Sequence, residues 1–276
     1  MILLRNDSLA VSVLDPVADK ELLGTRYCTG GFIFQVEDAR RGILLSGPTF
    51  PDSYNLFDGQ GAPDAFQPVL VAEQESDGST VLVLGVGIGL IDAKRNLVLE
   101  RCVWDIREGE GTLGFRTVQA AAGWSLRLER RLLLRGRTLR CETLLANTGS
   151  RHLPFQWYPH PFFPLYETGE CCRFSVPVTL PDNPGYELLE NGFLKMKGFP
   201  WKGPNENHFQ MLGHAGDRPM QIVQKHPVTS LVVATLDYVP TRLPVWGNRR
   251  TFSFEPYYDR VVSQGEETRW SITYDF

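Results

Sequence analysis

The feature that most constrains the fold is the alternation of apolar and polar residues in long segments of the chain. SLRLERRLLL (residues 125–134) and TLRCETLLAN (138–147) alternate apolar and polar residues, and Arg135-Gly136-Arg137 separates them. Because successive side chains of a β-strand point to opposite faces, this pattern predicts a hairpin with one buried face. ETRWSITYDF (267–276) alternates in the same way. Its apolar side consists of Trp270, Ile272, Tyr274 and Phe276.

Other segments extend the strand pattern over most of the chain. STVLVLGVGIGLI (79–91) and LVLERCVWDI (97–106) predict a second strand pair, joined through the turn-prone DAKRN. MQIVQKH (220–226) and TSLVVATLDY (229–238) repeat the alternation. Helical signals are few, and we expect only a turn or two between Pro63 and Gln74.

Length and turn residues agree with an all-β chain. The 26 glycines and 19 prolines supply frequent turns, and 276 residues is a normal length for one large β-sandwich or barrel. We find no internal repeat and no change of composition that would mark a linker. We therefore expect one domain over residues 1–276, with long functional loops.

One glycine motif needs a separate interpretation. Gly85, Gly87 and Gly89 form GxGxG after an apolar run, as in dinucleotide-binding sites. Such a site needs a helix next, so that the helix N-terminus faces the pyrophosphate. Here a turn and another strand are expected instead. The glycines therefore indicate a strand against which another part of the chain packs closely.

Charge and hydropathy exclude several classes of protein. The formal net charge is −4, and the sequence has no long basic cluster, so we expect no nucleic-acid partner. The short basic pairs Arg130-Arg131 and Arg249-Arg250 are predicted to be solvent-exposed. No stretch reaches the roughly 18 apolar residues of a membrane span. The N-terminal segment lacks a signal-peptide pattern, so we expect a cytoplasmic protein that begins with a strand.

The cysteines do not form a recognisable pattern. There are five, with scattered spacing and no CxxC: Cys28, Cys102, Cys141, Cys171 and Cys172. An odd number without motif spacing argues against a disulfide framework and a structural zinc site. We expect reduced cysteines in or near the core.

Two titratable residues stand among aromatic residues. His160 lies in PFQWYPHPFFPL (154–165), and Glu255 lies in TFSFEPYYD (251–259). Burial raises a carboxyl pKa and lowers that of histidine, which brings both toward neutrality, where proton transfer is most efficient. The same residues also fit a hydrogen-bonded core histidine and a strand-end salt bridge. From chemistry alone, both interpretations remain open.

The second half of the chain, from about residue 125 to 276, resembles the aldose 1-epimerase (galactose mutarotase) superfamily. Asn147-Thr148-Gly149 followed by His160-Pro161-Phe162-Phe163 is similar to the family's NTG-like turn and H-P-Y-F-like motif. ENHFQML (206–212) is similar to its D-x-x-F-x-L segment. SFEPYYD followed by QGEETRWSITYDF resembles its C-terminal pattern of E-P, then P-G-E and a last strand.

The resemblance implies a large antiparallel β-sandwich of the supersandwich type and a small-molecule sugar as partner. It implies that His160 is the general acid, Glu255 the general base and Glu206 a ligand of sugar hydroxyls, with no metal or organic cofactor. Three further hydroxyl-binding candidates lie in glycine-rich loops of the first half: Arg26, Asp64 and Gln67. Candidate stacking platforms for the sugar are Trp157, Trp201, Trp246 and Tyr258. Exposed sandwich edges also allow a homodimer.

The first half departs from the family pattern. Galactose mutarotases carry an additional histidine before the middle strands, whereas this chain has none before His152. A mutarotase-like enzyme therefore remains one hypothesis beside three others: a carbohydrate-binding or sensing protein, an epimerase or isomerase of a modified sugar, and a structural sandwich with a filled cleft.

Overall fold

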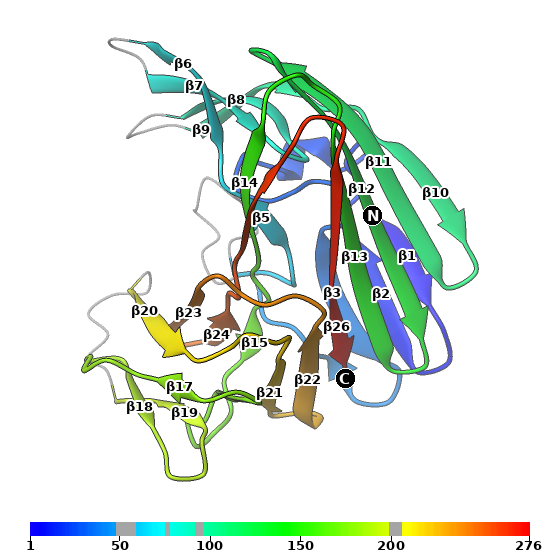
Figure 1. Cartoon of the computed structure of the whole chain (residues 1–276). Coiled ribbons are helices and arrows are strands. Elements are labelled where there is room, and N and C mark those ends of the chain that lie inside the picture. Colours follow the sequence, from blue (N-terminus) through cyan, green and yellow to red (C-terminus); the bar gives the residue numbers. More distant parts are fainter. Residues whose placement is uncertain (48–58, 75–77, 92–95, 199–205) are drawn as a thin grey trace.

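The computed structural model describes residues 1–47, 59–74, 78–91, 96–198 and 206–276. In these ranges the chain forms antiparallel strands and one 3₁₀ turn, η1 (Lys20–Leu22), with no α-helix. No helix long and apolar enough to cross a bilayer occurs in the described part. The expected all-β architecture, a large antiparallel β-sandwich, is therefore confirmed (Figure 1).

The largest sheet has eight strands and forms one side of the molecule (Figure 1). Its order is β10 (Asp105–Gly109), β11 (Thr112–Ala121), β12 (Trp124–Arg135), β13 (Thr138–Asn147), β26 (Glu267–Asp275), β22 (Ser230–Leu236), β21 (Gln221–His226) and β16 (Cys172–Phe174). The hairpin predicted from residues 125–147 is β12–β13, and Arg135 pairs with Thr138 across its turn. The last strand, β26, lies between β13 and β22.

Two sheets on the opposite side of the sandwich carry the residues of the candidate site (Figure 1). One joins β25 (Tyr258–Val262), β14 (Leu153–Pro159) and β5 (Asp64–Phe66). The other joins β15 (Phe163–Pro164), β24 (Thr251–Phe254), β23 (Leu243–Asn248), β20 (Asn207–His214) and β17 (Val178–Thr179).

Three smaller sheets complete the fold. The N-terminal one has β1 (Ile2–Arg5), β2 (Leu9–Val13), β3 (Ile33–Asp38) and β4 (Gly42–Ile43). Another has β6 (Val69–Gln74), β7 (Gly78–Val83), β8 (Gly87–Ile91) and β9 (Asn96–Arg101), and the third pairs β18 (Tyr186–Leu188) with β19 (Leu194–Met196).

The structure corrects three sequence-based expectations in the first half. Residues 79–91 form a hairpin rather than one strand, because Gly85 adopts a φ of +74° between β7 and β8. Residues 97–106 divide between β9 and β10. The turn or two of helix expected from Pro63 to Gln74 is wrong, since β5 and β6 occupy this segment. The close packing expected at the glycines is present, because a Cβ at Gly85 would overlap the Cys28 sulfur.

An aromatic cluster fills the core between β14 and the eight-stranded sheet. The Phe155 ring stacks on Trp270 at 5.2 Å between centroids, and the Trp157 ring meets Trp270 edge-on at 5.5 Å. Tyr258 of β25 packs on the same indole at 5.2 Å. Buried aromatic pairs of this kind add about 0.5–1.5 kcal/mol each beyond the burial of their area. The cluster therefore fixes β14 against β26.

All five cysteines are free, as expected.

A buried ion pair joins the two sides of the sandwich. Arg130 of β12 lies on the strand's apolar face and is only 2% exposed, which corrects the expectation of a solvated Arg130-Arg131 pair. Its guanidinium contacts the Asp64 carboxylate of β5. Burial raises the pKa of the Asp64 carboxyl, and the charge of Arg130 opposes that rise. Each charge has lost its hydration and therefore depends on the other.

We expect Arg130→Met to lower the free energy of unfolding by about 3–5 kcal/mol, because it leaves Asp64 buried without a counter-charge. The double variant Asp64→Leu/Arg130→Met should recover most of that loss. Arg116→Ala, which breaks only the half-exposed pair with Glu129, serves as control and should cost less than about 1 kcal/mol. Urea denaturation measures all three, and equal losses in Arg130→Met and Arg116→Ala would contradict the interpretation.

Candidate active site

His160 and Glu255 meet where two strands end. His160 follows the last residue of β14, and its backbone N–H donates to the Pro63 carbonyl at 2.8 Å. Glu255 follows β24, and its N–H donates to the Pro244 carbonyl at 2.9 Å. The imidazole Nε2 and the carboxylate Oε1 are 3.4 Å apart, and the residues are 1% and 4% exposed. The structure thus brings together the two residues predicted as acid and base.

Strand geometry directs both groups to the same place. Ser253 of β24 and Glu255, the first residue after the strand, are two positions apart, and both side chains contact the His160 ring. The Ser253 hydroxyl lies 2.8 Å from His160 Nδ1, so Ser253 and Glu255 contact opposite nitrogens of the ring. Sequence analysis missed Ser253. The sequence SFEP (253–256) could have indicated it, because Ser253 and Glu255 are two residues apart in an extended segment.

Aromatic rings surround the imidazole. Phe162 stacks on it at 4.3 Å between centroids, and Trp246 of β23 meets it edge-on at 5.6 Å. The rings of Tyr27 and Tyr158 lie at 6.1 Å. Burial lowers the pKa of His160 well below its ordinary value, and the positive charge of Arg26 lowers it further. The imidazole is therefore neutral at physiological pH.

A layered stack stands beside the pair. The rings of Tyr158 and Tyr257 are parallel at 4.4 Å between centroids, and the Arg242 guanidinium covers Tyr257 at 4.1 Å. Burial, and then the nearby charge of Glu255, raise the pKa of Tyr257 to about 12, although hydrogen bonds with Gln67 and Tyr158 oppose the rise. The Tyr257 phenol therefore remains protonated and can exchange hydrogen bonds with hydroxyl groups.

A cavity of about 220 Å³ opens next to this stack. Its lining unites two of the predicted hydroxyl-binding residues, Arg26 and Gln67, with Tyr158. The remaining lining residues are Thr25, Phe66, Pro68, Ile91 and Asn96. The lining is a mixture of apolar surface and a few polar groups, which is typical of small-molecule sites.

The other predicted site residues fall into distinct environments. Trp246 touches His160, whereas Trp157 and Tyr258 pack on Trp270 in the core, and Asp64 pairs with Arg130 there. Their roles toward a sugar stay predictions, but these three side chains contact the core cluster or its ion pair. Glu206 precedes β20, whose Phe209 pairs with Trp246. Trp201 lies outside the described residues.

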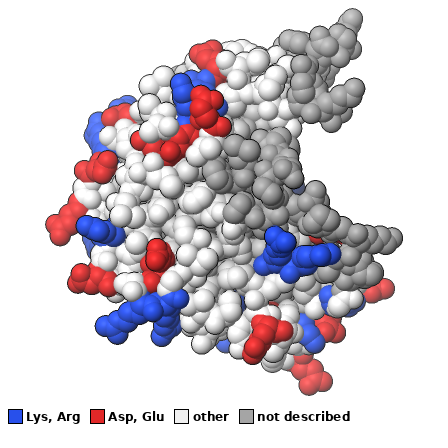
Figure 2. Space-filling model, turned by 180° about the vertical axis from the view of Figure 1, so that it is seen from behind, with Lys and Arg blue, Asp and Glu red and all other residues white. Residues whose placement is uncertain are grey.

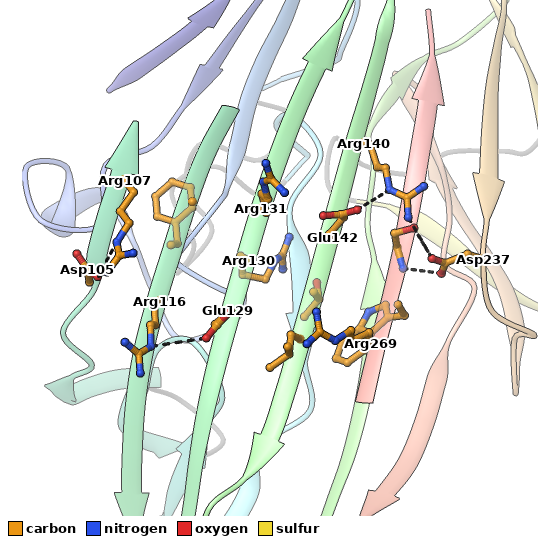
Figure 3. Close-up of a pocket in the computed structure, with 16 residues that line it drawn as sticks. Asp105, Arg107, Arg116, Glu129, Arg130, Arg131, Arg140, Glu142, Asp237 and Arg269 are labelled. Carbon is orange, nitrogen blue, oxygen red and sulfur yellow. Dashed lines mark hydrogen bonds and ion pairs between the residues drawn. The ribbon is translucent and has the colours of Figure 1, made fainter. Parts of the chain in front are cut away.

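A larger hollow of about 620 Å³ lies on the outer face of the eight-stranded sheet (Figure 3). Its charged side chains largely pair with one another, as Arg107 with Asp105, Arg116 with Glu129 and Arg140 with Glu142. Seen from behind the view of Figure 1, acidic and basic side chains are likewise interspersed on the surface (Figure 2). In the described part of the chain, none of the residues that line the hollow contacts His160 or Glu255, whereas Tyr158 of the smaller cavity is a ring neighbour of His160, so we assign the candidate active site to the buried pair and that cavity.

Comparisons with known proteins support the fold. Protein-family models and functionally characterised proteins give no match to the sequence. Solved structures do. A galactose mutarotase related enzyme from Lactobacillus acidophilus matches with a TM-score of 0.62 and 10% identity, over 99% of this chain and 96% of that one. A galactose mutarotase-like protein from Lactobacillus casei gives 0.58 and 14%, over 100% and 99%.

A third match extends the likeness to a eukaryote. An aldose epimerase homologue from C. elegans aligns with a TM-score of 0.50 and 9% identity, over 99% of this chain and 97% of that one. At such identities the likeness shows the fold and not the activity. The chain therefore has the galactose mutarotase-like fold over nearly its whole length.

The low pKa of His160 predicts a pH dependence of stability. Below pH 6.5 the unfolded chain binds a proton at this residue while the folded chain does not, so stability falls as the pH falls, by about 1.4 kcal/mol per pH unit for one proton. The effect ends at the folded-state pKa and is absent above pH 6.5. Urea denaturation at pH 5 and pH 7 should therefore show a smaller difference for His160→Gln than for the wild type. An unchanged difference would contradict the assignment of a neutral His160.

Proposed function

We propose that the protein is an aldose 1-epimerase-like enzyme that opens and recloses the ring of a hexose or related sugar. The observation that carries this proposal is the contact of His160 Nε2 with Glu255 Oε1 at 3.4 Å among aromatic rings. One of these rings, that of Tyr158, lies 6.1 Å from the imidazole between centroids and also lines the cavity of about 220 Å³. Ring opening needs one proton removed from the anomeric hydroxyl and one delivered to the ring oxygen. A neighbouring base and proton donor can perform both steps.

The spacing of the two groups suits the anomeric centre. The hydroxyl oxygen and the ring oxygen are bonded to the same carbon, so a pair of groups that lie side by side can reach both from one direction. Glu255 accepts the hydroxyl proton, His160 gives its Nε2 proton to the ring oxygen as the bond from the anomeric carbon to that oxygen breaks, and the proton on Glu255 passes to Nε2. The protein ends as it began, and the open aldehyde can rotate before the steps reverse.

A neutral imidazole is compatible with this scheme. Its N–H stabilises negative charge that develops on the ring oxygen, and the dry surroundings strengthen that interaction. The phenols of Tyr158 and Tyr257, with Arg26, Gln67 and Glu206, supply hydrogen-bonding groups for the remaining sugar hydroxyls, and Trp246 supplies an aromatic face. No organic cofactor or metal takes part in the proposed steps.

A carbohydrate-binding protein without catalysis is the second candidate. His160 and Glu255 contact each other and are nearly inaccessible, so each already has a partner before any sugar arrives. In that case the pair stabilises the floor of a sugar site and transfers no proton.

We expect His160→Ala and Glu255→Gln to lower the rate of anomer interconversion by about 10²- to 10⁴-fold, because each removes a proton-transfer group. Polarimetry or one-dimensional NMR with a panel of free and phosphorylated sugars measures this rate. Glu266→Gln, at an exposed position, is the control and should match the wild type. If no sugar reacts faster than in buffer while one raises the melting temperature, the binding protein is the better description.

Gln67→Ala tests the cavity. Loss of one hydrogen bond to the sugar should raise KM by about tenfold with a smaller change in kcat, since the group contacts the substrate away from the reacting atoms. Steady-state kinetics on the best sugar of the panel measures both constants. A fall in kcat at unchanged KM would place Gln67 in the reaction instead.

A further inference from the structure

Ser253 and His160 form an isolated polar contact inside the aromatic surroundings. The Ser253 hydroxyl lies 2.8 Å from His160 Nδ1, and the two residues are 0% and 1% exposed. Water therefore has almost no access to Nδ1. In a buried site, the direction of this hydrogen bond decides which ring nitrogen of the neutral imidazole carries the proton.

The bond can run in two directions. In the first, the serine hydroxyl donates to Nδ1, and the imidazole proton is on Nε2, the nitrogen that lies 3.4 Å from Glu255 Oε1. In the second, Nδ1–H donates to the serine oxygen, and the hydroxyl must donate elsewhere. In the described part of the chain, its other acceptor is the Phe254 carbonyl at 3.5 Å, the outer limit of a hydrogen bond.

The second direction has a further cost. It turns the lone pair of Nε2 toward Glu255 Oε1 at 3.4 Å, so the two groups repel unless the carboxyl takes up a proton. The first direction gives Nδ1 a hydrogen-bond donor and sets a positively polarised Nε2–H beside the carboxylate, which is a favourable electrostatic contact at 3.4 Å. The geometry therefore favours the tautomer with its proton on Nε2.

We propose that Ser253 is a positioning residue that holds His160 in this tautomer and so presents a proton at Nε2. The catalytic consequence rests on the proposed mutarotase-like function, whereas the tautomer itself does not. Without the hydroxyl, Nδ1 loses its donor, and the proton can move to either nitrogen. His160 then presents its Nε2 proton for only part of the time.

The strand provides a matched control. Thr251 is on the same face of β24, is equally buried, and donates its hydroxyl to the Phe163 carbonyl at 2.9 Å rather than to His160. Thr251→Val therefore removes a buried hydroxyl of the same strand and leaves the imidazole contacts intact. Any effect seen in Ser253→Ala and absent in Thr251→Val belongs to the contact with His160.

Nitrogen-15 NMR of the histidine rings, with His160→Gln to assign the signals, tests the tautomer without any sugar. The wild type and Thr251→Val should show Nε2 protonated and Nδ1 unprotonated, and Ser253→Ala should shift both signals toward a mixture. Ser253→Thr, which keeps the hydroxyl, should restore the wild-type pattern. A wild-type proton on Nδ1, or unchanged signals in Ser253→Ala, would overturn the proposal.

Kinetics on the best sugar then separate the two proposals. Ser253→Ala should lower kcat by about tenfold with KM nearly unchanged, and Thr251→Val should leave both nearly unchanged. An equal loss of kcat in both variants would reduce Ser253 to a structural role and overturn its assignment. If the tautomer behaves as expected and no sugar is turned over, the mutarotase-like function fails while the positioning role stands.

Discussion

The alternation of side chains along β14 is the constraint on which the site depends. One face of this strand carries Phe155 and Trp157, which pack on Trp270 and fix the strand to the eight-stranded sheet. The other face carries Tyr158 at the end of the strand, and His160 follows with the same parity. The packing of Phe155 and Trp157 thus stabilises the position of the whole strand, including Tyr158 on its other face. A shift of β14 by one residue would exchange the two faces and remove both core and site.

The burial that this packing produces determines the charge state of His160 and the contacts of its ring nitrogens. In water, a histidine and a glutamate side by side attract each other only weakly and exchange partners with solvent. Between Phe162, Trp246 and the tyrosine stack, neutral imidazole is favoured, and both ring nitrogens of His160 have a polar neighbour. The arrangement is therefore ordered before a substrate arrives, which is the condition under which hydrogen-bond donors stabilise developing charge most effectively.

Much of the fold was predictable because the long strands β12, β13 and β26 alternate in polarity over much of their length. The hairpin of β7 and β8 was not, since a glycine with positive φ inside an apolar run leaves no sign in the polarity pattern. The burial of Arg130 could have been predicted from its parity with the leucines of β12, but its partner could not, because Asp64 comes from a distant part of the chain. In the site, motif order placed His160 and Glu255, but no motif marks Ser253. Trp157 could have been assigned to the core from parity, since it is three residues from His160 and so faces the other way.

The buried pair of Asp64 and Arg130 has a consequence beyond its own energy. Asp64 belongs to β5, where it pairs with Pro159 of β14, and the neighbouring Pro63 carbonyl accepts the backbone hydrogen bond of His160. Arg130 of the eight-stranded sheet holds Asp64, and β5 in turn holds the start of the His160 segment. The ion pair thus fixes the position of the imidazole along the direction of β14. Contacts between apolar side chains can persist when one sheet shifts slightly against the other. Two buried opposite charges cannot, because they stabilise each other only when they are in direct contact. The ion pair therefore fixes the position of His160 and Glu255 relative to the eight-stranded sheet, although it contacts neither side chain.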